Sequence, residues 1–188
     1  MSLPIILKPK KNYKLSRFGR NYDGGYLVSS QSVSEAEILI SFGILDDTSF
    51  ELDFFNEKQI PILCYDHTIT KAYWKKRLFN DLGAAIYNLN WKFFKNSIDR
   101  YLESKKFFKL ENIKLYNESI TTGSVKKILD KNDFKKPLFF KIDIEGSEYR
   151  ILNEIIEFQD SICGLVIEFH DIDLHIAKII DFINKFNL

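Results

Sequence analysis

Charged side chains alternate with isoleucines in the segment "KIDIEGSE", at the end of an apolar run. Because successive side chains of a strand point to opposite faces, Lys141, Asp143 and Glu145 are expected on one face. The two carboxylates would then lie roughly 7 Å apart in an extended chain. A buried ion pair between Lys141 and Asp143 is one explanation, but buried charges are costly unless they are well paired. We therefore interpret the three charges as part of a hydrated site, in which they serve as a general base, a metal ligand or a substrate anchor.

A second polar group ends the run "GLVIEFHDID". If this run forms the strand next to the first one, Glu168 and His170 lie opposite Asp143 and Glu145. Histidine is well suited to accept a proton near neutral pH, and mixed carboxylate and imidazole ligands can also hold a divalent metal. We predict that His170 is the catalytic base and that Asp143 orients it or the substrate. The candidate metal ligands are Asp143, Glu168 and His170.

Acidic residues also follow an earlier run, "ILISFGILDD". Gly43 allows the chain to turn and a ligand to come close. Asp46 and Asp47 stand where a pyrophosphate would have to lie in a dinucleotide site. They would repel phosphate and favour a cationic ligand such as an ammonium or a sulfonium. The alternative is that they cap the next helix and complement its dipole.

Two further acids end the runs "PILCYDHT" and "LYNESI". An acid in the place of Asp66 commonly accepts hydrogen bonds from a ribose diol, and a cap for a helix starting near Thr68 is the alternative. Glu118 can reach the base or ribose of a cofactor, with a plain surface acid as the alternative. Both residues therefore extend the candidate cofactor site.

The elements that must position these residues follow from the hydrophobic pattern. Nearly continuous apolar runs predict buried parallel strands at residues 38–42, 60–65, 113–116, 138–144 and 162–169. Helical patterns follow at 48–58, 71–108, 123–131, 147–158 and 174–186, the second long enough for two helices. "DGGY", which includes Asp23, predicts a turn before a short strand at 26–29. Strand alternating with helix predicts right-handed crossovers and a doubly wound α/β sheet, in which ligands bind beyond the carboxyl ends of the strands.

Composition narrows the classes of function. The 188 residues suit a single domain, 1–188, with a substantial core, and a net charge of +1 gives no electrostatic case for nucleic acid. No apolar run reaches the ~18 residues of a membrane span, and no signal peptide is visible. Cys64 and Cys163 lie in apolar runs, which predicts free thiols in a reducing compartment and hence a cytoplasmic protein.

The segments "RFGRNYDGGYLV", "ISFGILDDTSFELDF", "CYDHT", "KIDIEGSEYRIL" and "LVIEFHDID" together resemble the FkbM-like S-adenosylmethionine-dependent methyltransferases. The resemblance covers most of the chain outside 71–110, and "KIDIEGSE" followed by "IEFH" is its most specific part. It implies a Rossmann-like class I methyltransferase fold and O-methylation of a hydroxyl on a sugar, a glycan or a natural-product precursor. The single glycine of "SFGI" departs from the glycine-rich loop of many methyltransferases.

Roles for the site residues follow from the charge argument and the resemblance together. The residues assigned to S-adenosylmethionine are Gly43, Asp46, Asp66, Glu118 and Asp143. Those assigned to the acceptor are Lys141, Glu145 and Glu168. The resemblance also implies a terminal antiparallel hairpin that this chain lacks. We therefore expect either self-association through the bare edge of the fifth strand or poor solubility.

Two alternatives remain beside this hypothesis. A non-catalytic, degenerate methyltransferase-like binding module would explain the incomplete sheet and the thin glycine motif. A nicotinamide-dependent oxidoreductase is disfavoured by the missing phosphate loop. The helical insertion at 71–108 carries aromatic side chains that can stack on a sugar or pack in the core: Tyr73, Trp74, Trp91, Phe93 and Phe94.

Overall fold

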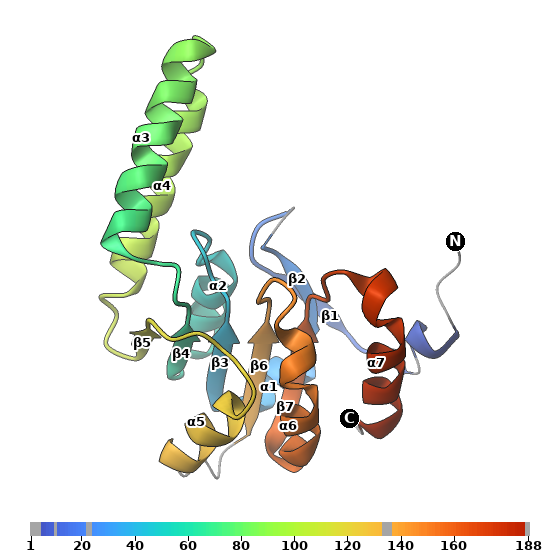
Figure 1. Ribbon diagram of the computed structural model, residues 1–188. Helices are drawn as coiled ribbons and strands as arrows, with labels where there is room; N and C mark the ends of the chain where they lie inside the picture. Colours follow the sequence, from blue (N-terminus) through green and yellow to red (C-terminus); the bar gives the residue numbers. More distant parts are fainter. Residues whose placement is uncertain (1–4, 10, 22–23, 133–136, 187–188) are drawn as a thin grey trace.

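The five apolar runs form one parallel sheet in the computed structural model, which describes residues 5–9, 11–21, 24–132 and 137–186 (Figure 1). The strands of the sheet are β3 (Ile38–Phe42), β4 (Ile62–Tyr65), β5 (Ile113–Tyr116), β6 (Leu138–Ile142) and β7 (Ile162–Ile167). All five predicted strands are confirmed, although β4, β6 and β7 are shorter than predicted. Strands covered on both faces explain the nearly continuous apolar sequence.

The order of the strands locates the switch point of the sheet. The order is β5-β4-β3-β6-β7, and every neighbouring pair is parallel. The chain therefore winds outward from β3 to β5, crosses back, and winds outward again from β6 to β7. The direction reverses between β3 and β6, where Phe42 lies opposite Ile142. This is a Rossmann-like α/β fold, in which ligands bind beyond the carboxyl ends of the strands at such a reversal.

Helices cover both faces of the sheet (Figure 1). Along the central strands, Ile40 and Phe140 point into one hydrophobic core, whereas Leu39 and Phe139 point into the other, as the two-residue period of a strand requires. The first core is closed by α5 (Ser124–Asn132), α6 (Leu152–Glu157) and α7 (Ile172–Lys185). The second is closed mainly by α1 (Ser30–Glu35) and α2 (Ser49–Lys58). Short 3-10 helices are η1 (Ile5–Leu7), η2 (Glu148–Arg150) and η3 (Gln159–Ser161).

An antiparallel β-hairpin packs against the second core. It consists of β1 (Leu15–Phe18) and β2 (Tyr26–Ser29), and it buries Phe18 and Val28. The predicted strand at 26–29 is confirmed. Neither β1, whose four residues include two polar ones, nor the six-residue α1 was predicted. Asp23 of the predicted turn lies outside the described residues.

A helical hairpin projects from the carboxyl end of the sheet (Figure 1). Its helices are α3 (Lys71–Tyr87) and α4 (Lys92–Phe107), which confirms two helices in the 71–108 segment. Trp74 and Phe107 at its base are buried in the second core. Across the described ranges, no helix combines the length and apolar character needed to cross a bilayer. Cys64 and Cys163 are free, as predicted.

Candidate functional site

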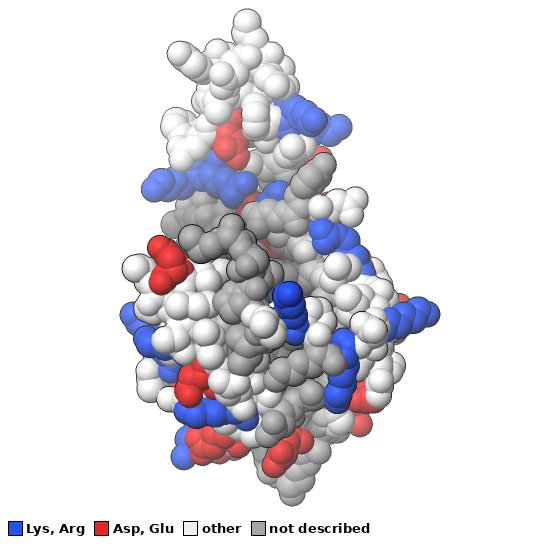
Figure 2. Space-filling model, turned by 90° about the vertical axis from the view of Figure 1, so that its right-hand side faces the viewer, with Lys and Arg blue, Asp and Glu red and all other residues white. Residues whose placement is uncertain are grey.

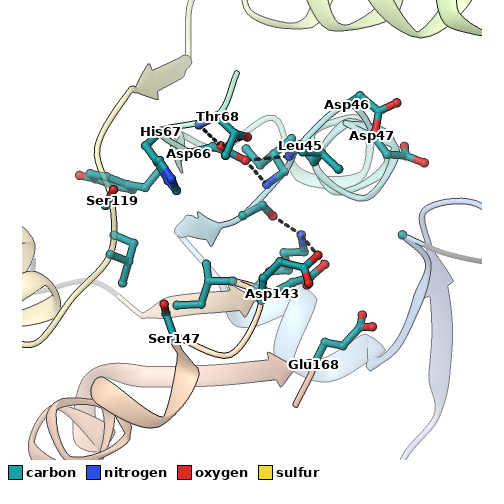
Figure 3. Close-up of a pocket in the computed structure, with 18 of the residues that line it drawn as sticks. Leu45, Asp46, Asp47, Asp66, His67, Thr68, Ser119, Asp143, Ser147 and Glu168 are labelled. Carbon is teal, nitrogen blue, oxygen red and sulfur yellow. Dashed lines mark hydrogen bonds and ion pairs between the residues drawn. The ribbon is translucent and has the colours of Figure 1, made fainter. Parts of the chain in front are cut away.

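A cavity of about 490 Å³ opens at the carboxyl ends of the central strands (Figure 3). This volume lies in the range of about 300–1,000 Å³ that is typical of small-molecule sites. All nine residues assigned to a site from the sequence line it: Gly43, Asp46, Asp66, Glu118, Lys141, Asp143, Glu145, Glu168 and His170. The topology therefore gathers side chains from five strand ends into one place, and what they bind stays a prediction.

Gly43 is required by the protein's own backbone. Its φ of 76° is in the left-handed region, and a Cβ at this position would lie 1.6 Å from the carbonyl oxygen of Asp143. The close approach that we expected for a ligand is thus made by the neighbouring loop. The Gly43 carbonyl in turn accepts a hydrogen bond from the Lys141 ammonium. These contacts join the loops that follow β3 and β6 and fix the floor of the cavity.

Asp66 is fully engaged by hydrogen bonds within the chain. Its Oδ2 accepts from the backbone N–H groups of Ile44 (2.9 Å) and Leu45 (2.7 Å). Its Oδ1 accepts from the backbone N–H and the hydroxyl of Thr68, at 2.7 and 2.6 Å. Burial alone would raise the pKa of Asp66, but the four donors together lower it below its ordinary value. Because a carboxylate offers about four acceptor positions, this geometry gives Asp66 a structural role, in which it braces the loop after β3. Asp66 does not cap the next helix, since α3 begins at Lys71 with Thr70 as its N-cap.

The first two acids of the site, Asp46 and Asp47, also have partners within the chain. Asp46 is buried and pairs with Arg77 of α3 at 2.8 Å and Arg100 of α4 at 3.0 Å. Asp47 precedes Thr48, the N-cap of α2, and accepts from the N–H of Ser49, the first residue of that helix, at 2.9 Å. Its other oxygen lies 3.4 Å from Arg20. Figure 3 shows both carboxylates directed away from Asp143. Their charge is therefore compensated internally, which weakens the argument for a cationic ligand at these two residues.

Glu118 remains at the rim of the cavity. Its side chain is half exposed and lies 3.8 Å from the Lys127 ammonium. A surface ion pair of this kind contributes little and leaves the carboxylate available.

Carboxylates and an imidazole converge at the ends of β6 and β7. One ligand atom each from Asp143, Glu168 and His170 lies within 4.8 Å of the others. The Tyr26 hydroxyl contacts Asp143 Oδ2 at 2.9 Å and Glu168 Oε2 at 2.6 Å. Because burial and these two acids raise the pKa of Tyr26, the hydroxyl keeps its proton. A hydroxyl has a single proton, so it satisfies only one of the two carboxylates at a time.

His170 is held by Glu148, a residue that the sequence patterns do not indicate. Its Nδ1 lies 2.5 Å from Oε1 of Glu148, a carboxylate with no exposed surface. The remaining ring nitrogen, Nε2, faces the cavity, 3.8 Å from Asp143 and 3.5 Å from Glu145. Partial burial lowers the pKa of His170, but the hydrogen bond and charge of Glu148, with the other two acids, raise it overall. We expected Asp143 to orient the imidazole or the substrate; Glu148 is the residue that holds the imidazole, and orientation of the substrate by Asp143 stays a prediction.

Lys141 is buried and bridges several groups. Its ammonium lies 3.6 Å from Asp143, the pairing expected from the sequence, and 4.0 Å from Glu51 of α2. Glu51 is fully buried and accepts a hydrogen bond from Ser41; burial raises its pKa. Lys141 therefore pairs with Asp143 on the buried side of the carboxylate, while His170 approaches the same carboxylate from the cavity.

One expectation about the site was wrong, and one alternative that the sequence left open is not supported. β6 ends at Ile142, so the alternation of faces does not extend to Glu145, which has a left-handed φ of 52° and a side chain that is 83% exposed. The aromatic residues of the helical insertion do not line the cavity: of the five, Trp74 and Tyr73 pack near the hairpin base and the other three lie near its far end. Stacking of these rings on a sugar within the cavity is therefore excluded.

The fold and the site define a Rossmann-like α/β protein with a cavity at its switch point. Comparison of the chain with models of known families, with curated proteins and with solved structures found no match. The resemblance to FkbM-like methyltransferases therefore rests on the motifs alone.

Proposed function

We propose that the protein is an S-adenosylmethionine-dependent O-methyltransferase that acts on a hydroxyl of a sugar, a glycan or a related natural-product precursor. The observation that carries the proposal is the pairing of a buried carboxylate with a histidine at the wall of an acidic switch-point cavity. Glu148 holds Nδ1 of His170, and Nε2 faces the cavity.

The charge of the cavity supports a cationic cofactor over a dinucleotide. Apart from Asp46 and Asp47, whose charges are compensated by arginines, its lining has an excess of acids over lysine and arginine: Asp66, Glu118, Asp143, Glu145 and Glu168 against Lys141 and Arg150. S-adenosylmethionine would supply a methyl group from a sulfonium and carries an ammonium and a ribose diol, with no phosphate. We propose that S-adenosylmethionine is held by the loop at Gly43, by the strand end at Asp66, and by Glu118 and Asp143.

The residues at the ends of β6 and β7 can prepare a hydroxyl for attack. Nε2 of His170 can accept the hydroxyl proton, and Glu148 stabilises the resulting imidazolium through Nδ1. Asp143, Glu145 and Glu168 surround the same position, and the Lys141 ammonium lies 3.6 Å from Asp143. Acid–base assistance of this kind contributes about 10²–10⁴-fold in rate, in addition to the effect of holding the two reactants together.

A divalent cation is a second candidate occupant of the same cluster. Asp143, Glu168 and His170 offer hard oxygen and imidazole ligands within reach of one ion. Metal-binding histidines usually have the other ring nitrogen held by a carboxylate, as Glu148 holds His170 here. A bound ion would lower the pKa of an acceptor hydroxyl. Calorimetry with Mn²⁺ on chelator-treated protein tests this, with Asp143→Asn expected to abolish binding and Asp46→Asn expected to preserve it.

Calorimetry with S-adenosylmethionine, S-adenosylhomocysteine and NAD⁺ tests the cofactor assignment. We expect both adenosyl compounds to bind and NAD⁺ to fail. Binding of NAD⁺ alone would overturn the proposal in favour of an oxidoreductase. Binding of S-adenosylhomocysteine without methyl transfer to any of a panel of sugar and polyol hydroxyls would favour the second candidate, a non-catalytic binding module. This candidate is supported by Asp66, whose acceptor positions are all filled by hydrogen bonds from within the chain.

We also propose self-association through β7. This strand lies at one end of the sheet order, and only β6 is paired with it among the described strands. An unpaired edge is a template for another strand. Sedimentation velocity is expected to show a dimer, and a protein that stays monomeric at every concentration contradicts this expectation.

A further inference from the structure

The far end of the α3–α4 hairpin exposes large apolar side chains together with lysines. We call residues 82–98 the hairpin tip. Five of its large apolar residues are more than half exposed: Ile86, Tyr87, Leu89, Trp91 and Phe93. Figure 2 shows the end of the projection as white, with charged side chains beginning below it. Exposed large apolar side chains gathered in one segment mark an interaction site more often than scattered single residues do.

The contrast with the base of the hairpin shows that the exposure is local. Trp74 at the base is 7% exposed and packs against Tyr101, whereas Trp91 at the tip is 60% exposed and Leu89 is 90% exposed. With 17 residues, α3 spans about 25 Å at ~1.5 Å per residue. The tip therefore stands well away from the cores, and folding of the sheet does not account for its apolar side chains.

The charges of the tip identify the chemistry of the partner. Residues 82–98 contain Lys92 and Lys95 and no acidic residue, and both lysines are exposed. They occupy the first turn of α4, where positive charge is unfavourable for the helix dipole. An anionic surface would offset this repulsion. Two copies of the tip placed together would instead bring four lysines into contact with no acid in either tip to pair with them.

We infer that the hairpin tip binds the surface of an anionic lipid bilayer. Tryptophan and tyrosine concentrate at membrane interfaces because their rings are apolar with one polar atom. Ile86, Leu89 and Phe93 bury their side chains among the acyl chains, and the Lys92 and Lys95 ammonium groups contact the head groups. The tip lies on the interface and does not span the bilayer.

Vesicle co-sedimentation of the full chain tests the inference. The protein is expected to pellet with vesicles of phosphatidylcholine and phosphatidylserine, to stay in solution with phosphatidylcholine alone, and to be released by salt. Lys92→Glu/Lys95→Glu should weaken binding by about tenfold or more. The matched control, Lys126→Glu/Lys131→Glu on α5, makes the same change in net charge away from the tip and should bind normally. Circular dichroism checks that each variant is folded.

The two tryptophans provide a second readout. Because Trp74 is already buried, a blue shift of the fluorescence on addition of anionic vesicles reports Trp91, and Trp91→Phe should remove it. Failure of the wild-type chain to bind anionic vesicles overturns the inference. Equal loss of binding in the α5 control overturns it as well. Concentration-dependent self-association that Leu89→Ser/Trp91→Ser abolishes, without vesicle binding, would make the tip a protein–protein surface instead.

Discussion

The two halves of the cavity use the same residue types in opposite ways. At the end of β3, two arginines pair with the charge of Asp46. At the end of β4, hydrogen bonds from the chain fill all the acceptor positions of Asp66. At the ends of β6 and β7, Asp143 and Glu168 share one tyrosine hydroxyl, and among the described lysines and arginines Lys141 alone forms an ion pair with Asp143. The acids of the first half are satisfied by partners within the protein and hold its loops in place. The acids of the second half can still accept a hydrogen bond or a positive charge from a ligand. Chemistry is therefore expected at β6 and β7.

The largest expected effect is on turnover after loss of the histidine in the β6–β7 half. His170→Ala should lower kcat by about 10²–10⁴-fold, because the proton acceptor is gone, while calorimetry should find S-adenosylhomocysteine affinity nearly unchanged. His67 is a matched control, since it lines the same cavity in the β3–β4 half. Equal losses in His67→Ala and His170→Ala would remove the distinction between the two halves.

The next effect concerns the stability of the β3–β4 half. Asp66→Ala leaves the N–H groups of Ile44, Leu45 and Thr68 without their acceptor. At roughly 1–3 kcal/mol for a buried donor left unpaired, the free energy of unfolding should fall by about 2–4 kcal/mol in urea denaturation. Asp143→Asn should change it less and abolish activity. A stable Asp66→Ala variant that binds S-adenosylhomocysteine weakly would instead restore the ribose-binding role predicted from the sequence.

A third effect concerns pH. Glu148 and the neighbouring acids raise the pKa of His170 above its ordinary 6.5, so a base at this position becomes neutral, and active, only as the pH rises through the raised pKa. In chelator-treated protein, the NMR titration of His170 should therefore have its midpoint above 6.5. Glu148→Gln should move both this midpoint and the alkaline rise of kcat to lower pH. An unchanged midpoint would show that Glu148 does not set the protonation of His170.

The smallest effect is expected at Glu145. Its exposed carboxylate lies 3.5 Å from Nε2 of His170, and exposed ion pairs contribute about 0–1 kcal/mol. Glu145→Gln should therefore change kcat/KM by less than about fivefold. A loss as large as that of His170→Ala would place Glu145 among the residues that contact the reacting groups.

The sequence predicts the sheet well, and it also predicts that the polar residues gather at one edge of it, because both depend on local patterns. Apolar runs define β3 to β7, and the polar residues that end them must meet at one edge of a parallel sheet. The partners of those residues depend on tertiary contacts. Glu148 falls in the first turn after "EGS", where an acid is typical of a helix N-terminus, and no pattern shows that it turns inward to His170. Tyr26 belongs to a short strand distant in sequence from Asp143 and Glu168, so its shared hydroxyl was equally hidden.

Asp46 links the cavity to the α3–α4 hairpin, because it takes part in both. It lines the cavity, and it is the carboxylate to which Arg77 and Arg100 fasten the two helices of the hairpin. A ligand that draws Asp46 toward itself must weaken these two ion pairs and so change the position of the hairpin. Because such coupling is reciprocal, the factor by which the ligand shifts the position of the hairpin is also the factor by which that position changes the affinity for the ligand. Hydrogen exchange in α3 and α4 with and without S-adenosylhomocysteine measures this linkage, and identical exchange in both states would limit Asp46 to a static fastening.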